Sequence, residues 1–191
     1  MGYNLFMEIL DIVDDNDNVI GKEPREMVHT QGLRHREIHV WFFNNKGQIL
    51  FQKRGKNVDT APGLLDASVG GHVDLGTTYK QSAINEVREE TGLNIGEENL
   101  IFIDKIPAEH IDSLGLINKV FRSIFTYEYN GSIDELVPEE DKSDGFEWWD
   151  IEDVLNLSDG QKQLFVSAVT DAIYVDKVFI QIKKQRLIVS R

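Results

Sequence analysis

The chain has 191 residues, with 33 acidic against 20 basic side chains, so its formal net charge is −13. This length fits one domain with a full core over residues 1–191, and the absence of cysteine excludes disulfides, thiolate metal sites and a cysteine nucleophile. The acidic balance argues against nucleic acid and anionic membranes as partners. Because no apolar run reaches membrane-spanning length and MGYNLFMEIL lacks a signal-peptide pattern, we expect a cytoplasmic protein.

The first part of the chain, about residues 8–23, predicts a β-hairpin. Two short strands flank the polar turn DDNDN at residues 14–18. This acidic turn lacks the glycine and the distant glutamate of an EF-hand loop, so we assign no calcium to it. Pro24 then favours the start of a short helix that runs to about His29.

A second hairpin is predicted from strands over residues 38–43 and 48–53. Its second strand ends in the basic residues Lys53, Arg54 and Lys56, which stand out in so acidic a chain. These residues form either a solvated rim or a contact for substrate phosphate. Arg54 is the best candidate for phosphate, because a guanidinium fork binds two oxygens at once.

The next stretch predicts an amphipathic helix. Thr78 and Gln81 form a capping-box pattern and Gly92 is a C-terminal stop, so the helix should run from about Tyr79 to Thr91. At about 100° per residue, its two sides differ in character. The side that should pack on a sheet carries Ala83, Ile84, Val87 and Thr91, and the opposite side carries Glu86, Glu89 and Glu90.

The three glutamates are candidate metal ligands. Like charges four residues apart, as at Glu86 and Glu90, cost roughly 0.2–0.5 kcal/mol on an exposed helix, and a divalent cation reverses this penalty. Oxygen ligands without cysteine or a histidine pair suit Mg²⁺ or Mn²⁺. A strand over residues 64–69 leads into Gly70 and Gly71, where a backbone carbonyl can approach a metal without an intervening Cβ. The alternative is a solvated acidic helix without metal, although such faces usually intersperse basic residues.

After this helix, strands are predicted over residues 100–106 and 119–129. The loop between them contains Pro107, Glu109, His110 and Asp112, and we expect it to act as a lid. An acidic loop over residues 134–144 follows, and its Glu139 and Glu140 are either further metal or base carboxylates or part of a solvated loop.

The C-terminal part predicts a strand over residues 146–149 and a helix over residues 151–155. A second amphipathic helix is expected over residues 161–174, at the start of a C-terminal region of about residues 161–191. Residues 177–189 are rich in β-branched side chains in uneven alternation. This tail forms either a hairpin or part of an interface, such as that of a homodimer.

The glutamate helix and the turn before it resemble the Nudix hydrolases. The signature of that family is Gly, five residues, Glu, seven residues, Arg-Glu, an apolar residue, any residue, Glu-Glu, any residue, Gly and an apolar residue. Seven positions between residues 71 and 93 fit in register, namely Gly71, Glu86, Val87, Glu89, Glu90, Gly92 and Leu93. Two positions depart, because Thr77 replaces the first Glu and Asn85 replaces the Arg. The resemblance implies the Nudix fold, an α+β architecture in which a mixed β-sheet forms the centre of an α/β/α sandwich.

The resemblance also implies a reaction, the metal-dependent hydrolysis of a diphosphate bond in a nucleoside diphosphate linked to a further group X. The metal ligands would be the Gly71 carbonyl and Glu86, Glu89 and Glu90, holding Mg²⁺ or Mn²⁺. The general base would be one of Glu86, Glu89, Glu139 and Glu140, and the sequence leaves this choice open. Because of the two departures, the alternative is a weak or inactive Nudix-fold module that binds and senses a nucleotide.

A wider segment, from about residue 8 to residue 157, is similar to the Nudix branch of isopentenyl-diphosphate isomerase. It shares His35, the FNNKGQ turn, Pro62-Gly63 and SVGGHV. In that branch, histidines matching His35, His72 and, with a one-residue gap, His29 bind a metal, and a cysteine matching Gly70 transfers a proton. Since Gly70 cannot transfer a proton, isomerisation is the least favoured activity. The histidines are either structural or a second metal site, and we place His72 with Arg54 among the candidate substrate ligands.

Overall fold

The computed structural model describes residues 8–58, 60–112 and 114–189, so residues 1–7 of the stretch inspected for a signal peptide lie outside it. The strands are β1 (Ile9–Val13), β2 (Val19–Pro24), β3 (His35–Phe43), β4 (Gln48–Arg54), β5 (Leu65–Asp66), β6 (Val69–His72), β7 (Ile101–Ile111), β8 (Ile117–Glu128) and β9 (Ser143–Asp150). The helices are α1 (Arg25–Gln31), α2 (Tyr79–Thr91), α3 (Ile151–Leu155), α4 (Asp159–Lys162), α5 (Ser167–Thr170), α6 (Ala172–Lys177) and α7 (Phe179–Val189). None of the helices in these ranges has the length and hydropathy needed to cross a membrane.

β3 is the centre of a mixed sheet. The sheet has seven strands in the order β5-β4-β3-β8-β7, with β6 also paired to β3 and β9 to β4. β3 runs parallel to β8 and antiparallel to β4 and β6. Its side chains alternate between two buried clusters, because neighbouring residues of a strand point to opposite faces. Trp41 and Phe43 belong to one cluster, and Val40 and Phe42 belong to the other. Burial on both faces explains the continuous apolar run in this strand.

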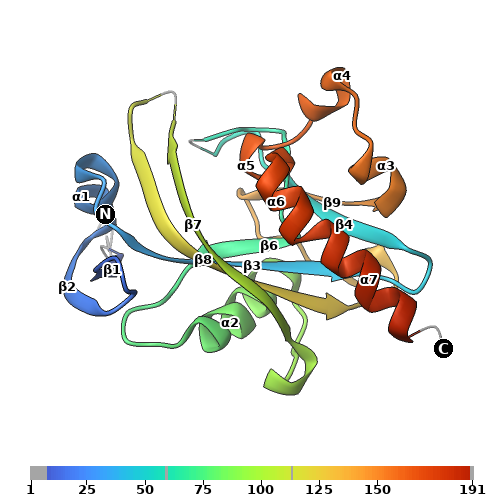
Figure 1. Ribbon diagram of the computed structural model, residues 1–191, viewed down its shortest axis with the longest axis horizontal. Helices are drawn as coiled ribbons and strands as arrows, with labels where there is room; N and C mark the ends of the chain where they lie inside the picture. Colours follow the sequence, from blue (N-terminus) through green and yellow to red (C-terminus); the bar gives the residue numbers. More distant parts are fainter. Residues whose placement is uncertain (1–7, 59, 113, 190–191) are drawn as a thin grey trace.

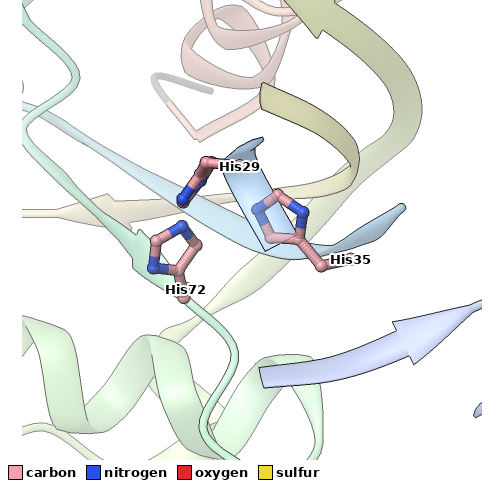
Figure 2. A group of neighbouring side chains, drawn as sticks. All are labelled: His29, His35 and His72. Carbon is pink, nitrogen blue, oxygen red and sulfur yellow. The ribbon is translucent and has the colours of Figure 1, made fainter. Parts of the chain in front are cut away.

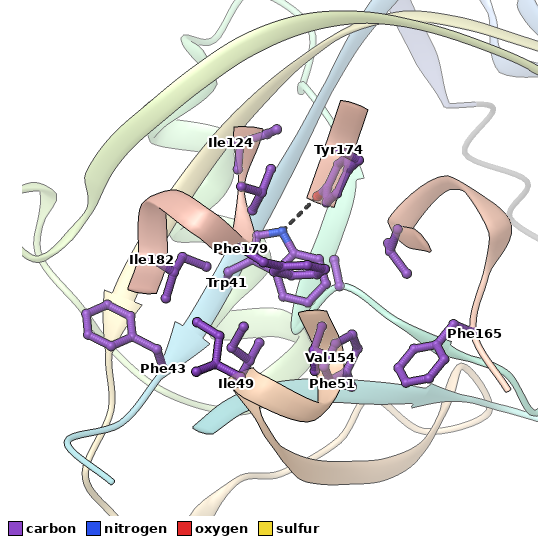
Figure 3. Packing of buried hydrophobic residues seen from close by; sticks show 14 of the residues in the cluster. Trp41, Phe43, Ile49, Phe51, Ile124, Val154, Phe165, Tyr174, Phe179 and Ile182 are labelled. Atoms are coloured by element: carbon purple, nitrogen blue, oxygen red, sulfur yellow. Dashed lines mark hydrogen bonds between the residues drawn. The ribbon is translucent and has the colours of Figure 1, made fainter. Parts of the chain in front are cut away.

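Helices cover both faces of the sheet (Figure 1). On one face, Ala83 and Val87 of α2 pack into the cluster of Val40 and Phe42. On the other face, Phe179 of α7 packs edge-on against Trp41 at a ring-centroid distance of 4.8 Å. The Trp41 indole N–H also donates to the Tyr174 hydroxyl of α6 at 2.7 Å (Figure 3). The expected three-layer α/β/α sandwich with a mixed sheet is therefore confirmed.

The glutamate helix α2 has the predicted bounds. The Thr78 side chain accepts from the backbone N–H of Gln81, and Gln81 completes the capping box. Gly92 ends the helix in the left-handed region, with φ of 74°, a conformation that glycine adopts without steric cost. The N-terminal hairpin forms as β1 and β2, while the strand expected over residues 64–69 is divided between β5 and β6.

The lid expected around Pro107 is wrong. β7 continues through this segment to Ile111 and pairs antiparallel with β8, with Pro107 opposite Phe121. β7 lies at the edge of the sheet, where the missing N–H of a proline costs no ladder hydrogen bond. The turn of this long hairpin is short, and Asp112 caps it by accepting from the backbone of Leu114 and Leu116.

The C-terminal region also differs from the sequence prediction. The helix expected over residues 161–174 is replaced by the short helices α4, α5 and α6, because Phe165 leaves the helical path to bridge Leu65 of β5. The tail is the helix α7, in which Phe179 and Ile182 are buried against the sheet. Phe179 and Ile182 are three residues apart and lie on one face of a helix, and their packing outweighs the β-propensity of the tail. The homodimer stays a prediction, which light scattering on the purified chain tests.

Candidate active site

Gly71 and Glu86 are in direct contact. Gly71 lies on β6 opposite Ile38 of β3. A Cβ atom at position 71 would lie 2.3 Å from Glu86 Oε1, far inside any non-bonded contact distance. Only glycine at this position lets the Glu86 carboxyl rest on the backbone of β6. The structure thus brings together two of the predicted metal ligands, which are 15 positions apart in the printed sequence.

Glu90, one turn further along α2, is buried beside Glu86. Its side-chain Oε2 accepts a hydrogen bond from Gln52 Nε2 of β4 at 2.9 Å. The backbone N–H of Gly70 points to the same oxygen at 3.4 Å. These donors, from β4 and β6, hold the carboxyl in one orientation. Gln52 was not identified from the sequence, since only the pairing of β4 in the sheet brings it here.

The electrostatics of the two buried carboxyls fit a cation. Burial, followed by the charges of Glu89 and Asp74, raises the pKa of Glu86 to about 8. Burial and the neighbouring Glu86 raise the pKa of Glu90 well above its usual range. A divalent ion between the two would stabilise their charged forms and reverse both shifts. The residues present therefore fit the Mg²⁺ or Mn²⁺ expected from the sequence.

Glu89 and the acidic loop complete the carboxylate cluster. Glu89 is exposed at the rim, with Arg88 Nη2 at 3.7 Å. Within the loop, Glu139 acts on the pKa of both Glu86 and Glu90, and it forms a 2.7 Å ion pair with Lys142. Burial opposes the charge of Lys142, but Glu139 and the two helix glutamates raise its pKa. Glu140 is exposed at the following turn. Lys142 was missed, although a single basic residue in this acidic loop was a usable signal.

A protein-family model described as the NUDIX domain matches residues 33–167. This chain belongs to the Nudix hydrolase family. It is 30% identical over 158 residues to an uncharacterized Nudix hydrolase of Clostridium acetobutylicum, across 81% of this chain and 75% of that protein. It is 38% identical over 86 residues to Escherichia coli YfcD, across 45% of this chain and 48% of YfcD. The chain thus spans about half the length of several relatives it matches.

Solved structures show the same fold. The crystal structure of DR0079 from Deinococcus radiodurans has a TM-score of 0.59 and 25% identity, covering 78% of this chain and 87% of that one. The MutT protein of Methanosarcina mazei has a TM-score of 0.58 and 19% identity, covering 80% of this chain and 94% of that one. Because the second likeness is so distant in sequence, it supports the Nudix fold alone.

The two departures from the Nudix signature meet at Asp74, which the sequence did not single out. Asn85 Nδ2 donates to Asp74 Oδ2 at 3.2 Å. The Thr77 hydroxyl bonds the Asp74 carbonyl at 2.9 Å and the Ser82 hydroxyl at 2.6 Å. Asp74 also raises the pKa of Glu86. Thr77 and Asn85 therefore organise a carboxylate beside the site, in place of the Glu and Arg of the Nudix signature.

The Arg54 guanidinium forms hydrogen bonds within the chain. Its guanidinium donates to Asp66 Oδ2 at 3.0 Å, to the Thr60 carbonyl at 2.9 Å and to the Thr60 hydroxyl at 3.1 Å. These bonds fasten the loop between β4 and β5 to the strands on either side of it. The assignment of Arg54 to substrate phosphate stays a prediction, which depends on the guanidinium exchanging one of these partners for a phosphate oxygen.

His72 belongs to a different cluster. It follows Gly71 on β6, and neighbouring strand residues point to opposite faces, so its ring is directed away from Glu86. It lies beside His29 of α1 and His35 of β3 (Figure 2), with ring-centroid distances between 5.0 and 5.2 Å. The structure brings together the three histidines named from the sequence. Arg54, in contrast, donates to Asp66 and Thr60.

Proposed function

We propose that this Nudix protein is a metal-dependent hydrolase that cleaves the diphosphate bond of a nucleoside diphosphate linked to a further group X. The observation that carries the proposal is the Glu86 carboxyl held on the Gly71 backbone. Next to it, Glu90 is fixed by Gln52, and Glu89 stands at the solvent rim. Such a set of oxygens is what Mg²⁺ and Mn²⁺ prefer, and it needs no cysteine or histidine.

In this proposal the ligands of the ion are the Gly71 carbonyl and the carboxylates of Glu86, Glu89 and Glu90. A bound ion would neutralise the charge of the diphosphate oxygens and would orient the attacking water. Gln52 orients Glu90, and burial of α2 against the sheet fixes the spacing of the glutamates. These side chains are held in position before substrate binds, so few of them need to be ordered during the reaction.

We assign the proton transfer from water to Glu139, with Glu86 and Glu89 as the alternatives. Glu139 comes from the loop before β9 and acts electrostatically on the helix glutamates, and in this proposal it is not among the ligands of the ion. Lys142, paired with Glu139 at 2.7 Å, supplies a positive charge for the diphosphate once substrate enters. Glu140 is exposed, and it serves as the matched control position for the base.

For the substrate side we retain Arg54 as a candidate phosphate ligand. The assignment of His72 to substrate also stays a prediction, and its ring lies beside those of His29 and His35. The group X and the base preference are open, since the carboxylates and Lys142 would contact only the diphosphate and its metal.

The second candidate is a Nudix-fold module that binds a nucleotide without cleaving it. Its support is the replacement of the Glu and Arg of the signature by Thr77 and Asn85, which leaves Glu86 without a cationic neighbour on α2 at the preceding position. Isomerisation of isopentenyl diphosphate is the least supported activity. Gly70, opposite His39, carries no side chain that could exchange a proton.

The test is a screen of nucleoside diphosphate-X compounds, nucleoside triphosphates and isopentenyl diphosphate with Mg²⁺ and with Mn²⁺ in ¹⁸O-labelled water. We expect ¹⁸O in a phosphate product, loss of turnover in Glu90→Gln and in Glu139→Gln, and retention of turnover in Glu140→Gln. Nucleotide binding without turnover of any compound favours the sensor. Formation of dimethylallyl diphosphate would reverse the ranking in favour of the isomerase.

A further inference from the structure

The N-terminal β-hairpin contacts the part of the chain that joins Gly71 to the glutamate helix. This part, residues 73–78, runs from the end of β6 to the start of α2, and we call it the connecting segment. The hairpin of β1 and β2 belongs to residues 8–32, outside the matched NUDIX domain of residues 33–167. Figure 1 shows the hairpin beside the loop that enters α2. An element outside the domain therefore touches the link between the proposed metal ligands.

The connecting segment receives one bond from β1. Most of its residues are exposed, and its turn is closed by the backbone N–H of Thr77, which donates to the Asp74 carbonyl at 3.0 Å. Within this turn Gly76 has a φ of 73°. The backbone N–H of Gly76 donates to Asp11 Oδ2 of β1 at 3.1 Å. Asp11 thus fastens the turn that carries Asp74 and Thr77 beside the carboxylate site.

Asp17, in the turn of the hairpin, contacts the first residue of α2. The Tyr79 hydroxyl lies 3.1 Å from each of the two Asp17 carboxylate oxygens. Arg36 Nε of β3 donates to Asp17 Oδ1 at 2.7 Å, and Lys105 Nζ of β7 donates to Oδ2 at 2.6 Å. Only 9% of the Asp17 side chain is exposed. One carboxylate therefore joins the start of α2 to two strands of the sheet.

The conformation of the hairpin turn leaves the Asp17 carboxylate available for these contacts. Asp14 closes the turn, because its Oδ1 accepts from two backbone N–H groups of the turn at 2.8 and 2.9 Å. Asp17 has a φ of 65°, in the left-handed region that aspartate adopts more readily than most residues. Burial opposes the charge of Asp17, but Lys105 and Arg36 lower its pKa below the ordinary value. The carboxylate thus stays charged and accepts from all three partners.

We propose that Asp17 is a positioning residue of the metal site, which fixes the start of α2 through Tyr79 and, together with Asp11, holds the connecting segment in one conformation. This role rests on the proposed function, since its effect is exerted on the ion. The Glu86 carboxyl rests on the Gly71 backbone, so a shift of α2 changes the spacing between two ligands of one ion. A misplacement of about 1 Å can cost on the order of a hundredfold in rate.

Tyr79→Phe tests the link, because it removes the bond to Asp17 and leaves the aromatic ring in its cluster. Mn²⁺ affinity is measured without substrate by electron paramagnetic resonance of the free ion, and kcat and KM are measured separately. We expect Mn²⁺ affinity and kcat to fall about tenfold with KM unchanged, since losing one bond shifts α2 by less than about 1 Å. Tyr127→Phe is the matched control, because it removes the same group in the same cluster, and it should behave as the parent does.

Asp17→Asn tests the same link from the hairpin. Asparagine tolerates the left-handed turn and keeps one oxygen, but it gives up the charge. Combining it with Tyr79→Phe should lower Mn²⁺ affinity no further than Asp17→Asn alone, because both changes break one link. Asp15→Asn is the control in the same turn, since the Asp15 side chain is 91% exposed and pairs with Arg34. Additive losses in the double variant would overturn the link.

Hydrogen exchange of residues 73–82 without metal completes the test. We expect faster exchange there in Tyr79→Phe and unchanged exchange in Tyr127→Phe, whether or not the parent cleaves a substrate. A lower Tm with unchanged exchange, Mn²⁺ affinity and kcat in Tyr79→Phe would show a bond that only stabilises the fold, and it would overturn the positioning role alone. A parent that binds neither Mg²⁺ nor Mn²⁺ would overturn the proposed function, and the positioning role with it.

Discussion

A methyl group on Gly71 would lie 2.3 Å from the Glu86 carboxylate. This contact links the turn after β6 to the glutamate helix, and it explains why the position carries glycine although its backbone lies in a β-strand. The reason is the approach of a neighbouring side chain, and it does not involve an unusual φ angle. The geometry of the metal site therefore depends on a missing Cβ atom as much as on the glutamates themselves.

Gly71→Ala should displace the Glu86 carboxyl by about 1 Å or more and lower turnover on the order of a hundredfold. The same change should weaken the stabilisation by Mg²⁺. Gly70→Ala is the matched control, because its Cβ would meet the nearest atom, His39 Cδ2, at 3.3 Å, a tight but adjustable contact. Turnover and Mg²⁺-dependent Tm are measured for both. Equal losses in the two variants would show that the contact with Glu86 is not what matters.

Mg²⁺ or Mn²⁺ should stabilise the protein. Binding to the folded state alone adds about 2.7 kcal/mol once the free ion is a hundredfold above its dissociation constant. Glu90→Gln should reduce this gain, because it removes a buried charge that the ion compensates. Thermal unfolding at increasing Mg²⁺ and Mn²⁺ concentrations measures the effect. An unchanged Tm through millimolar concentrations of both ions would falsify the metal site.

Without metal, the stability should fall as pH rises. The pKa of Glu86 is raised to about 8 in the folded chain, so between its ordinary value and pH 8 the folded state binds a proton that the unfolded state has released. The stabilisation is complete below the unfolded pKa and is lost as pH rises through 8. Glu86→Gln should reduce this loss of stability by on the order of 1–3 kcal/mol, while Glu90, whose pKa is also raised, keeps its own contribution of the same sign. Chemical denaturation with a chelator present, from pH 5 to 9, measures it in both proteins.

Arg122 should stabilise the folded protein by pairing with the buried carboxylate of Glu37. The Arg122 Nη2 and Nε atoms lie 2.7 and 2.8 Å from Glu37 Oε2. Burial opposes the charge of Glu37, but Arg122 holds its pKa at about 2. Arg122→Met leaves the buried Glu37 carboxylate without its partner and should lower the free energy of unfolding by about 3–5 kcal/mol. The double variant Arg122→Met with Glu37→Gln should recover much of this loss.

The pH dependence separates these variants. In the parent, the folded pKa of Glu37 lies below the unfolded one, so its stabilisation is present above about pH 4.5 and is lost as pH falls toward 2. In Arg122→Met the sign reverses, because the buried carboxyl now prefers its proton, and acidification should stabilise the protein. Denaturation curves at pH 3, 5 and 7 distinguish the two. The same acid dependence in parent and variant would mean that Arg122 does not set the charge of Glu37.

The local part of this architecture was predictable from the sequence, and the long-range part was not. The bounds of α2 follow from Thr78, Gln81 and Gly92, which act within one turn of the helix ends. The helical tail depends on the packing of Phe179 against Trp41, which no local pattern reveals. In the site, the glutamates come from one helical face. Gln52, Asp74 and Lys142 come from other segments of the chain. The spacing of residues in the sequence does not predict that these segments lie beside the glutamates.

Thr77 and Asn85 should behave as one coupled change. In the Nudix signature these positions hold a Glu and an Arg, and replacing both preserves the local charge while replacing one does not. Here both side chains meet at Asp74, where Asn85 bonds the carboxylate and Thr77 bonds the carbonyl. Asn85→Arg alone should therefore pair with Asp74 and help little, whereas Thr77→Glu with Asn85→Arg should give the new Arg a second acid and orient it toward Glu86.

We expect the double variant to raise turnover on a nucleoside diphosphate substrate above both single variants and above the parent. Parent, single and double variants form a double-mutant cycle, and the coupling is the departure of the double variant from the sum of the single effects. Additive effects, or a double variant no faster than a measurable parent, would mean that the two replacements are independent. If no variant turns over any substrate while nucleotide still binds, the sensor replaces the hydrolase. In that case the loss of the signature Glu and Arg is not the reason for the missing turnover, because putting both back does not produce it.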